Sequence, residues 1–84
     1  MYRVIPDEEV FEQVAALPFE ALLSYAEALA VLEVAPANGR PYNADHPERP
    51  MRELVFGQRG EGTITCLMLD AAREVHVLLV QWVG

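Results

Sequence analysis

The sequence contains one cysteine, few basic residues and no long apolar run. Because Cys66 has no second cysteine to pair with, an internal disulfide and a cysteine-built zinc site are excluded, and a reducing compartment fits best. The longest apolar stretch, residues 75–83, is interrupted by His76 and Gln81 and is shorter than the roughly 20 residues of a membrane helix. The N-terminus lacks a basic-then-apolar leader pattern. We therefore expect a cytoplasmic protein that does not associate with membranes.

Positive charge is scarce. Six basic residues, all arginines, face 13 acidic residues, which gives a net charge of −7. Most of the acids lie in the first 50 residues, on the segments predicted below to be helical. An acidic body repels nucleic acid at long range, so RNA or DNA binding would need a local basic cluster. The charge counts against a nucleic-acid function without excluding it.

The chain length of 84 residues is enough for one domain, residues 1–84, with one core. Hydrophobic residues make up 52% of the chain, which is ample for folding without a disulfide or a structural metal. We expect no cofactor. Asp45, His46 and Glu48 are the best metal-ligand group, but no second cluster completes a coordination sphere, so we expect no metal site.

The hydrophobic pattern changes from helical spacing to strand alternation near residue 51. Asp7 is expected to cap the first helix, and Pro18 and Pro36 are expected to close the two helices. The predicted elements are a strand over 2–5, helices over 7–17 and 19–35, an irregular loop over 36–50, and strands over 51–56, 63–69 and 75–83. The predicted fold is α+β, in the order β-α-α-β-β-β, with a helical hairpin on one face of a mainly antiparallel sheet.

The last two strands are apolar on both faces, which is typical of strands with a covering on each side. In the second helix, an apolar stripe is predicted to face the sheet, and it comprises Leu22, Leu23, Ala26, Leu29 and Ala30. Two helices cover only one face of a sheet. The other face is therefore predicted to be a partner surface or a shallow apolar groove.

The order of elements resembles the RelE/ParE superfamily of bacterial type II toxins. The resemblance is carried by Tyr2-Arg3-Val4-Ile5, the Leu17-Pro18 hinge, the helix 26–32 running into Pro36 and Gly39, the strand 51–57, a glycine turn, and a hairpin pivoting at Asp70. It implies a toxin or toxin-derived domain that a cognate antitoxin protein binds. RelE-like members cleave mRNA in the ribosome, and ParE-like members inhibit DNA gyrase.

The sequence departs from the nuclease pattern of that superfamily. Thr63 and Ile64 stand where an aromatic-arginine pair often follows the glycine turn, and the chain stops at Trp82-Val83-Gly84 without a basic residue. Two functions therefore stay open. One is a metal-independent mRNA interferase acting at the ribosome. The other is a non-catalytic interaction module on the same fold, binding a protein partner or forming a homodimer through the uncovered sheet face.

RNA cleavage without a metal needs a base, an acid and cations that stabilise the phosphorane. Arg52 lies where the superfamily often keeps a basic residue, and its alternative role is a cross-strand ion pair with an acid such as Asp70 or Glu74. Arg49 is a second cation in the preceding loop.

His46 and His76 are the side chains that titrate near neutrality. Each has a structural alternative: His46 as a solvated loop residue, and His76 as a satisfied strand residue on the face of Val80 and Trp82. The catalytic candidates are thus Arg52, Arg49, His46 and His76.

Overall fold

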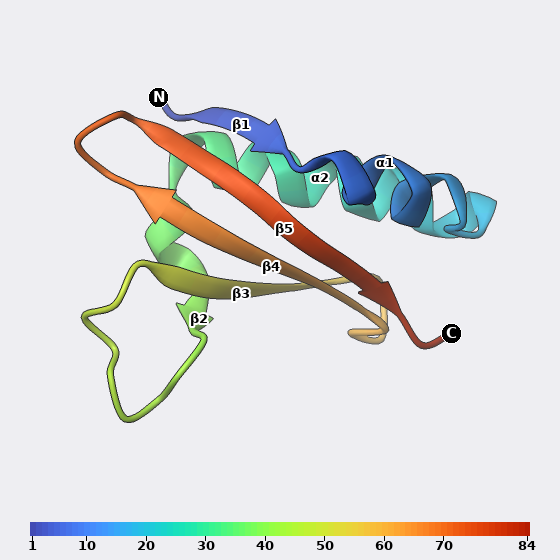
Figure 1. Cartoon of the computed structure of the whole chain (residues 1–84). Coiled ribbons are helices and arrows are strands. Elements are labelled where there is room, and N and C mark those ends of the chain that lie inside the picture. The colour runs from blue at the N-terminus through green and yellow to red at the C-terminus, as the bar shows by residue number, and fades with distance from the viewer.

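The computed structural model describes residues 1–84. Two helices and five strands follow one another along the chain, as Figure 1 shows. They are β1 (Arg3–Pro6), α1 (Glu8–Ala15), α2 (Phe19–Val34), the short 3-10 helix η1 (Pro36–Asn38), β2 (Arg40–Pro41), β3 (Met51–Phe56), β4 (Gly62–Leu69) and β5 (Glu74–Trp82). The predicted α+β class is confirmed. Neither helix is long and apolar enough to cross a membrane.

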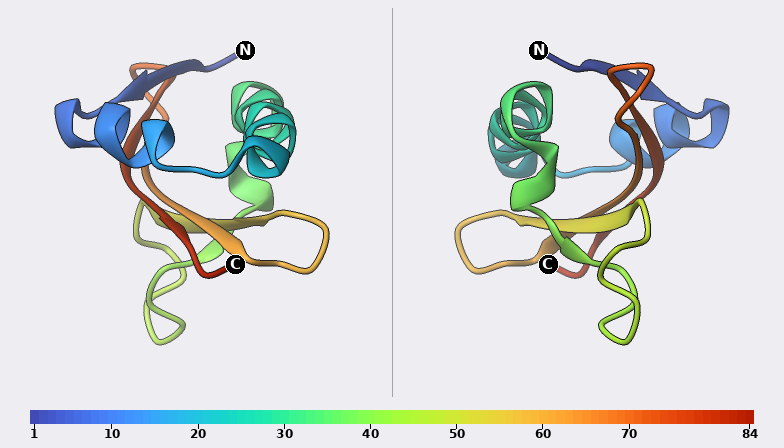
Figure 2. Two further views of the ribbon diagram at one scale, coloured as in Figure 1. Left: turned by 90° about the vertical axis from the view of Figure 1, so that its right-hand side faces the viewer. Right: turned by 90° about the vertical axis from the view of Figure 1, so that its left-hand side faces the viewer.

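The five strands form one sheet in the order β1-β5-β4-β3-β2. β3, β4 and β5 are the predicted antiparallel meander, and β1 joins β5 in parallel, with Arg3 opposite Glu74. β2 lies within the loop that was predicted to be wholly irregular, and it pairs with the start of β3. The sheet curves around α2, while the segment between β2 and β3 projects away from the helices (Figure 2).

The core lies between α2 and the middle strands. Ile64 and Cys66 on β4 and Val75 and Val77 on β5 are completely inaccessible to solvent. Phe56 at the end of β3 joins two further aromatic rings, since its centroid lies 5.7 Å from that of Tyr25 and 5.7 Å from that of Trp82. Burial of this apolar surface supplies the main driving force for folding.

The buried side of α2 differs from the predicted one. Ala21, Tyr25, Ala28 and Leu32 face the core, whereas Leu23 from the predicted stripe is 71% exposed. Because α2 is apolar on nearly every side, helical spacing alone does not select a face. The small side chains of the two alanines let the helix approach the sheet closely. The outer side of α2 is left with several exposed apolar residues.

A register shift in the β4–β5 pair reverses part of the predicted face of β5. Thr65 pairs with Leu79 and Cys66 pairs with Val77, so Leu78 is an extra residue. An extra residue in one strand turns the following side chains to the opposite face. Val80 and Trp82 therefore lie on the core side with Val77, and His76 lies on the other face. The prediction that His76 shares a face with Val80 and Trp82 is wrong.

Helix α1 lies against β5 beyond the end of β1. The backbone N–H of Asp7 donates to Val77 O at 2.9 Å, and the N–H of Val80 donates to the Gln13 side-chain oxygen at 2.7 Å. These bonds satisfy edge groups of β5 that β1 is too short to reach. Asp7 occupies the N-cap position as predicted, but its side chain makes no capping hydrogen bond. The helix ends at Ala15, two residues earlier than predicted.

Candidate functional site

Arg52 anchors the loop between β2 and β3. Strand alternation places its side chain on the same face of β3 as Leu54 and Phe56, which is the face that α2 covers. Its Nη2 donates to the Pro47 carbonyl oxygen at 3.1 Å, and its Nε is buried without a partner. The alternative ion pair with Asp70 or Glu74 does not form. Arg52 therefore carries a charge that no carboxylate neutralises.

The loop over residues 42–50 is built from consecutive turns. The His46 N–H donates to Asn43 O at 3.0 Å, and the Arg49 N–H donates to His46 O at 3.1 Å. The His46 imidazole lies 3.3 Å from a Glu48 carboxylate oxygen and is exposed, as its solvated-residue alternative predicts. The turns thus hold His46 and Arg49 in one small segment.

Arg49 lines a cleft of about 430 Å³ at the base of this loop. Tyr42, Asn43, Ala44 and Met51 line it as well. No carboxylate lies within ion-pair distance of Arg49. Tyr42, which our sequence predictions omitted, contributes an exposed aromatic side chain to the same cleft. An aromatic residue within a proline-rich loop is the one sequence signal that points to it.

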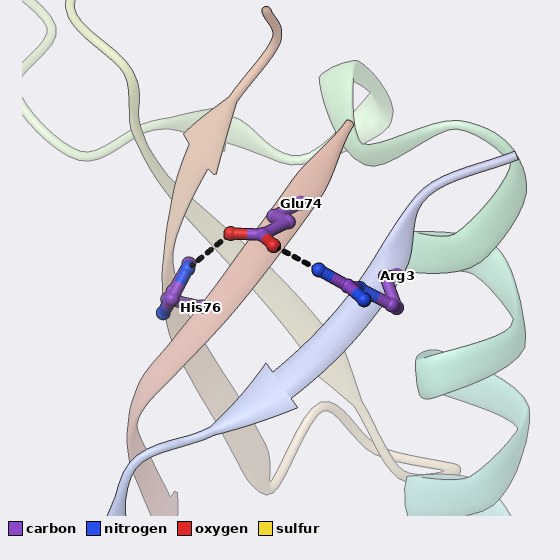
Figure 3. Close-up of polar contacts among 3 residues, drawn as sticks. All are labelled: Arg3, Glu74 and His76. Carbon is purple, nitrogen blue, oxygen red and sulfur yellow. Dashed lines mark hydrogen bonds and ion pairs between the residues drawn. The ribbon is translucent and has the colours of Figure 1, made fainter. Parts of the chain in front are cut away.

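His76 belongs to a separate polar group, which Figure 3 shows. Its Nε2 lies 3.0 Å from one Glu74 carboxylate oxygen, and the other oxygen of Glu74 accepts a hydrogen bond from Arg3. The hydrogen bonds from His76 and Arg3 lower the pKa of Glu74 below its ordinary value. Arg3 and Glu74 were absent from the predicted site because their contact depends on the parallel β1–β5 pairing. The group joins the edge strand to the sheet.

The four predicted catalytic residues do not form one constellation. His46, Arg49 and Arg52 all belong to the loop or to its anchor on β3. His76 pairs with Leu67, which pairs with Met51 at the start of β3. Two strand spacings, about 10 Å, therefore separate the His76 backbone from that of Met51. No hydrogen bond joins any two of the four side chains.

Most of the other cations of the molecule are neutralised. Arg3 pairs with Glu74, and Arg40 pairs with Glu53 at 3.1 Å. Arg73 lies 4.0 Å from Asp70, and its guanidinium stands 5.1 Å from the centre of the Tyr2 ring. Besides Arg49 and Arg52, only Arg59 in the glycine turn lacks a carboxylate partner. Two of the three arginines without a carboxylate partner therefore belong to the 42–50 loop or to its anchor on β3.

Cys66 is unsuited to nucleophilic chemistry. It is completely inaccessible in the middle of β4, and burial raises its pKa to about 11 despite the nearby charge of Arg52. A thiol with so high a pKa is almost entirely protonated at neutral pH and unreactive. No group of three or more histidine, cysteine and acidic side chains is placed to hold a metal ion.

Comparison with known proteins identifies the fold. No family model matches the sequence, and no curated protein sequence matches it. Among solved structures, the isolated Escherichia coli RelE toxin superimposes with a TM-score of 0.79, at 12% identity, over 100% of this chain and 86% of RelE. A chain of the intact E. coli RelBE toxin–antitoxin complex gives 0.78, at 13% identity, over 100% of this chain and 99% of its own length.

An archaeal structure is also similar in fold. The RelE–RelB complex of Pyrococcus horikoshii contains a chain that superimposes with a TM-score of 0.67, at 15% identity, over 99% of this chain and 96% of that one. At such identities the similarity concerns the course of the backbone. The chain has a RelE-like fold, so the predicted resemblance is confirmed at the level of the fold.

Proposed function

We propose that this protein is the toxin-type component of a type II toxin–antitoxin pair and that a cognate antitoxin protein binds it. The observation that carries the proposal is the RelE-like fold, which extends over the whole chain. Two of the similar structures are toxin–antitoxin complexes of RelE with RelB. A chain with the same backbone offers a comparable body for a protein partner.

The charge distribution favours action through protein contacts. Three of the six arginines are paired with carboxylates, and the net charge is −7. Such a surface has little long-range attraction for RNA. In this version of the proposal, the protein acts by binding its target, as a non-catalytic module would. Apolar residues of the uncovered sheet face, such as Leu67 and Leu79, offer a surface for that target or for a second copy of the chain.

A specific observation supports mRNA cleavage as the second candidate function. Arg49 and Arg52 have no carboxylate partner, and both lie at the loop that also holds His46. In this mechanism the His46 imidazole accepts the proton of the RNA 2′-hydroxyl, because His76 lies in the separate group with Glu74. The 2′-oxygen attacks the adjacent phosphorus, and the 5′-oxygen leaves with a proton from an acid. The two arginines would stabilise the charge on the phosphorane.

Co-expression with the protein encoded by the adjoining reading frame tests the main proposal. We expect the two proteins to purify together as one complex of fixed stoichiometry. Incubating the purified chain with translating ribosomes, followed by mapping of the mRNA ends, tests the second candidate. Cleaved mRNA would establish the interferase, whereas intact mRNA together with a stable complex would favour the non-catalytic version. Absence of a complex would contradict the main proposal.

A further inference from the structure

Two clefts of similar volume differ in the charge of their walls. A cleft of about 470 Å³ lies between α2 and the end of β3, and Glu20 and Glu27 line it without any basic residue. The cleft of about 430 Å³ at the 42–50 loop is lined by Arg49 and by no acidic residue. Carboxylates repel an anionic ligand, and an arginine attracts one. Of these two clefts, the one at the loop therefore suits an anion.

The arginine of the loop cleft keeps its hydrogen-bonding groups free for a ligand. No carboxylate lies within ion-pair distance of Arg49, and its side chain makes no hydrogen bond within the chain. The two acidic residues of the loop, Asp45 and Glu48, do not line the cleft, and Glu48 contacts the His46 imidazole at 3.3 Å. A guanidinium binds the oxygens of a phosphate through paired, charge-assisted hydrogen bonds. Arg49 can therefore bind a phosphate group.

An aromatic side chain lines the same cleft. Tyr42 is 55% exposed, so its ring is accessible to a ligand, and Ala44 and Met51 add apolar surface. Exposed aromatic rings stack on the unpaired bases of single-stranded nucleic acid. A nucleotide joins a phosphate to a flat aromatic base. Its two parts match the guanidinium and the aromatic ring of this cleft.

Backbone hydrogen bonds shape the cleft before a ligand binds. The Tyr42 N–H donates to Met51 O at 3.0 Å, which ties the start of the loop to β3. Arg52 Nη2 donates to the Pro47 carbonyl oxygen at 3.1 Å, which ties the later part of the loop to the same strand. A wall that is already ordered loses less conformational entropy on binding. The volume of about 430 Å³ lies within the range of small-molecule sites, roughly 300–1,000 Å³.

We propose that this cleft holds one nucleotide of a single-stranded RNA, with its base stacked on Tyr42 and a phosphate bound by Arg49. This inference rests on the proposed function, since it deepens the second candidate by adding Tyr42 as a residue that positions RNA at the loop of His46. The net charge of −7 opposes long-range attraction of RNA, so contacts within the cleft carry the binding.

The test uses the full chain without ribosomes, and the amide resonances of Asn43 and Ala44 report on the cleft. The probes are adenosine monophosphate, a single-stranded RNA tetranucleotide, and ribose phosphate, which has no base. Tyr42→Leu should weaken binding of both nucleotide probes roughly tenfold and leave ribose phosphate binding unchanged, whereas Tyr42→Phe should keep all three affinities. Arg49→Gln should weaken all three. Arg59→Gln is the control, because Arg59 also lacks a carboxylate partner but lies outside the cleft.

Tyr42 and Arg49 are exposed, so their replacement should leave the fold intact, which circular dichroism checks. Tighter binding of the tetranucleotide than of the mononucleotide would support RNA as the source, and equal affinities would overturn that assignment in favour of a free nucleotide. No resonance change with any probe, or unchanged affinity of Tyr42→Leu and Arg49→Gln, would overturn the inference. Co-purification with the adjoining protein tests the main proposal separately. Nucleotide binding together with intact mRNA on ribosomes would contradict the interferase alone.

Discussion

The β1–β5 end of the sheet and the loop before β3 use charged residues in opposite ways. At the sheet end, one carboxylate, Glu74, binds both Arg3 and His76. At the loop, Arg49 has no carboxylate partner, and Arg52 is bound only to a carbonyl oxygen. Where acidic and basic side chains neutralise one another, as at the sheet end, they hold the structure together. Basic side chains without a carboxylate partner, as at the loop, are available to a ligand. The comparison directs functional tests to the loop and stability tests to the sheet end.

The largest effect is expected from Arg52→Ala in an assay of ribosome-dependent mRNA cleavage. If the loop carries that activity, loss of this cation should lower the cleavage rate on the order of 100-fold, the usual effect of removing one group that stabilises the transition state. Arg40→Ala, whose arginine is paired with Glu53, is the control and should cleave at the original rate. Cleavage that survives Arg52→Ala unchanged would remove Arg52 from the mechanism.

Alkylation of Cys66 measures whether the sheet beneath the loop opens. The ordinary thiol pKa of 9.0 rises to about 11 in the folded protein. The thiolate fraction at neutral pH is therefore lower by roughly 100-fold than in an unfolded chain, and alkylation should slow by at least that factor. Iodoacetamide labelling followed by mass spectrometry, with and without denaturant, gives the two rates. Equal rates would mean that the loop side of the sheet opens readily.

The Glu74 group predicts a dependence of stability on pH. Because the pKa of Glu74 is lowered in the folded state, its contribution is fully present above the ordinary carboxyl value of 4.5 and is lost as the pH falls below it. Glu74→Gln should therefore lower the melting temperature at pH 7 and have a smaller effect at pH 3. An equal effect of this substitution at both pH values would show that the Glu74 charge does not stabilise the fold.

The smallest change in stability is expected for Arg49→Ala. Arg49 is exposed and has no ion-pair partner, so its replacement should change the free energy of unfolding by less than about 0.5 kcal/mol. Urea denaturation compared with Arg3→Ala, which breaks a contact with Glu74, measures the difference between the two regions. A larger loss of unfolding free energy for Arg49→Ala than for Arg3→Ala would contradict the stated difference between the loop and the sheet end.

The elements of the fold could be predicted from the sequence, but several faces could not. Prolines, glycines and the change from helical to alternating spacing gave β3, β4 and β5 nearly at their observed bounds. Nothing in the local sequence marks Leu78 as the extra residue, because the residues directly before and after it are both apolar. The same uniformity hid the buried side of α2, where Ala21 and Ala28 face the sheet in place of larger leucines.

The candidate site was predictable only where its residues are close in sequence. His46 and Arg49 lie within one loop, and the structure keeps them there. The Arg3–Glu74 contact spans 71 residues and depends on the pairing of the first strand with the last. No local pattern encodes a pairing at that distance, so the role of Arg3 became visible only in the fold.

The most direct test of the central claim is induced expression in a bacterial host, with and without the adjoining reading frame. The proposed toxin-type function predicts that the chain alone slows growth and that co-expression of its neighbour restores it. Phe56→Ala, which removes an aromatic side chain from the core, is the control for loss of the folded protein. Normal growth with the folded, unchanged chain, together with no complex between the two proteins, would contradict the account.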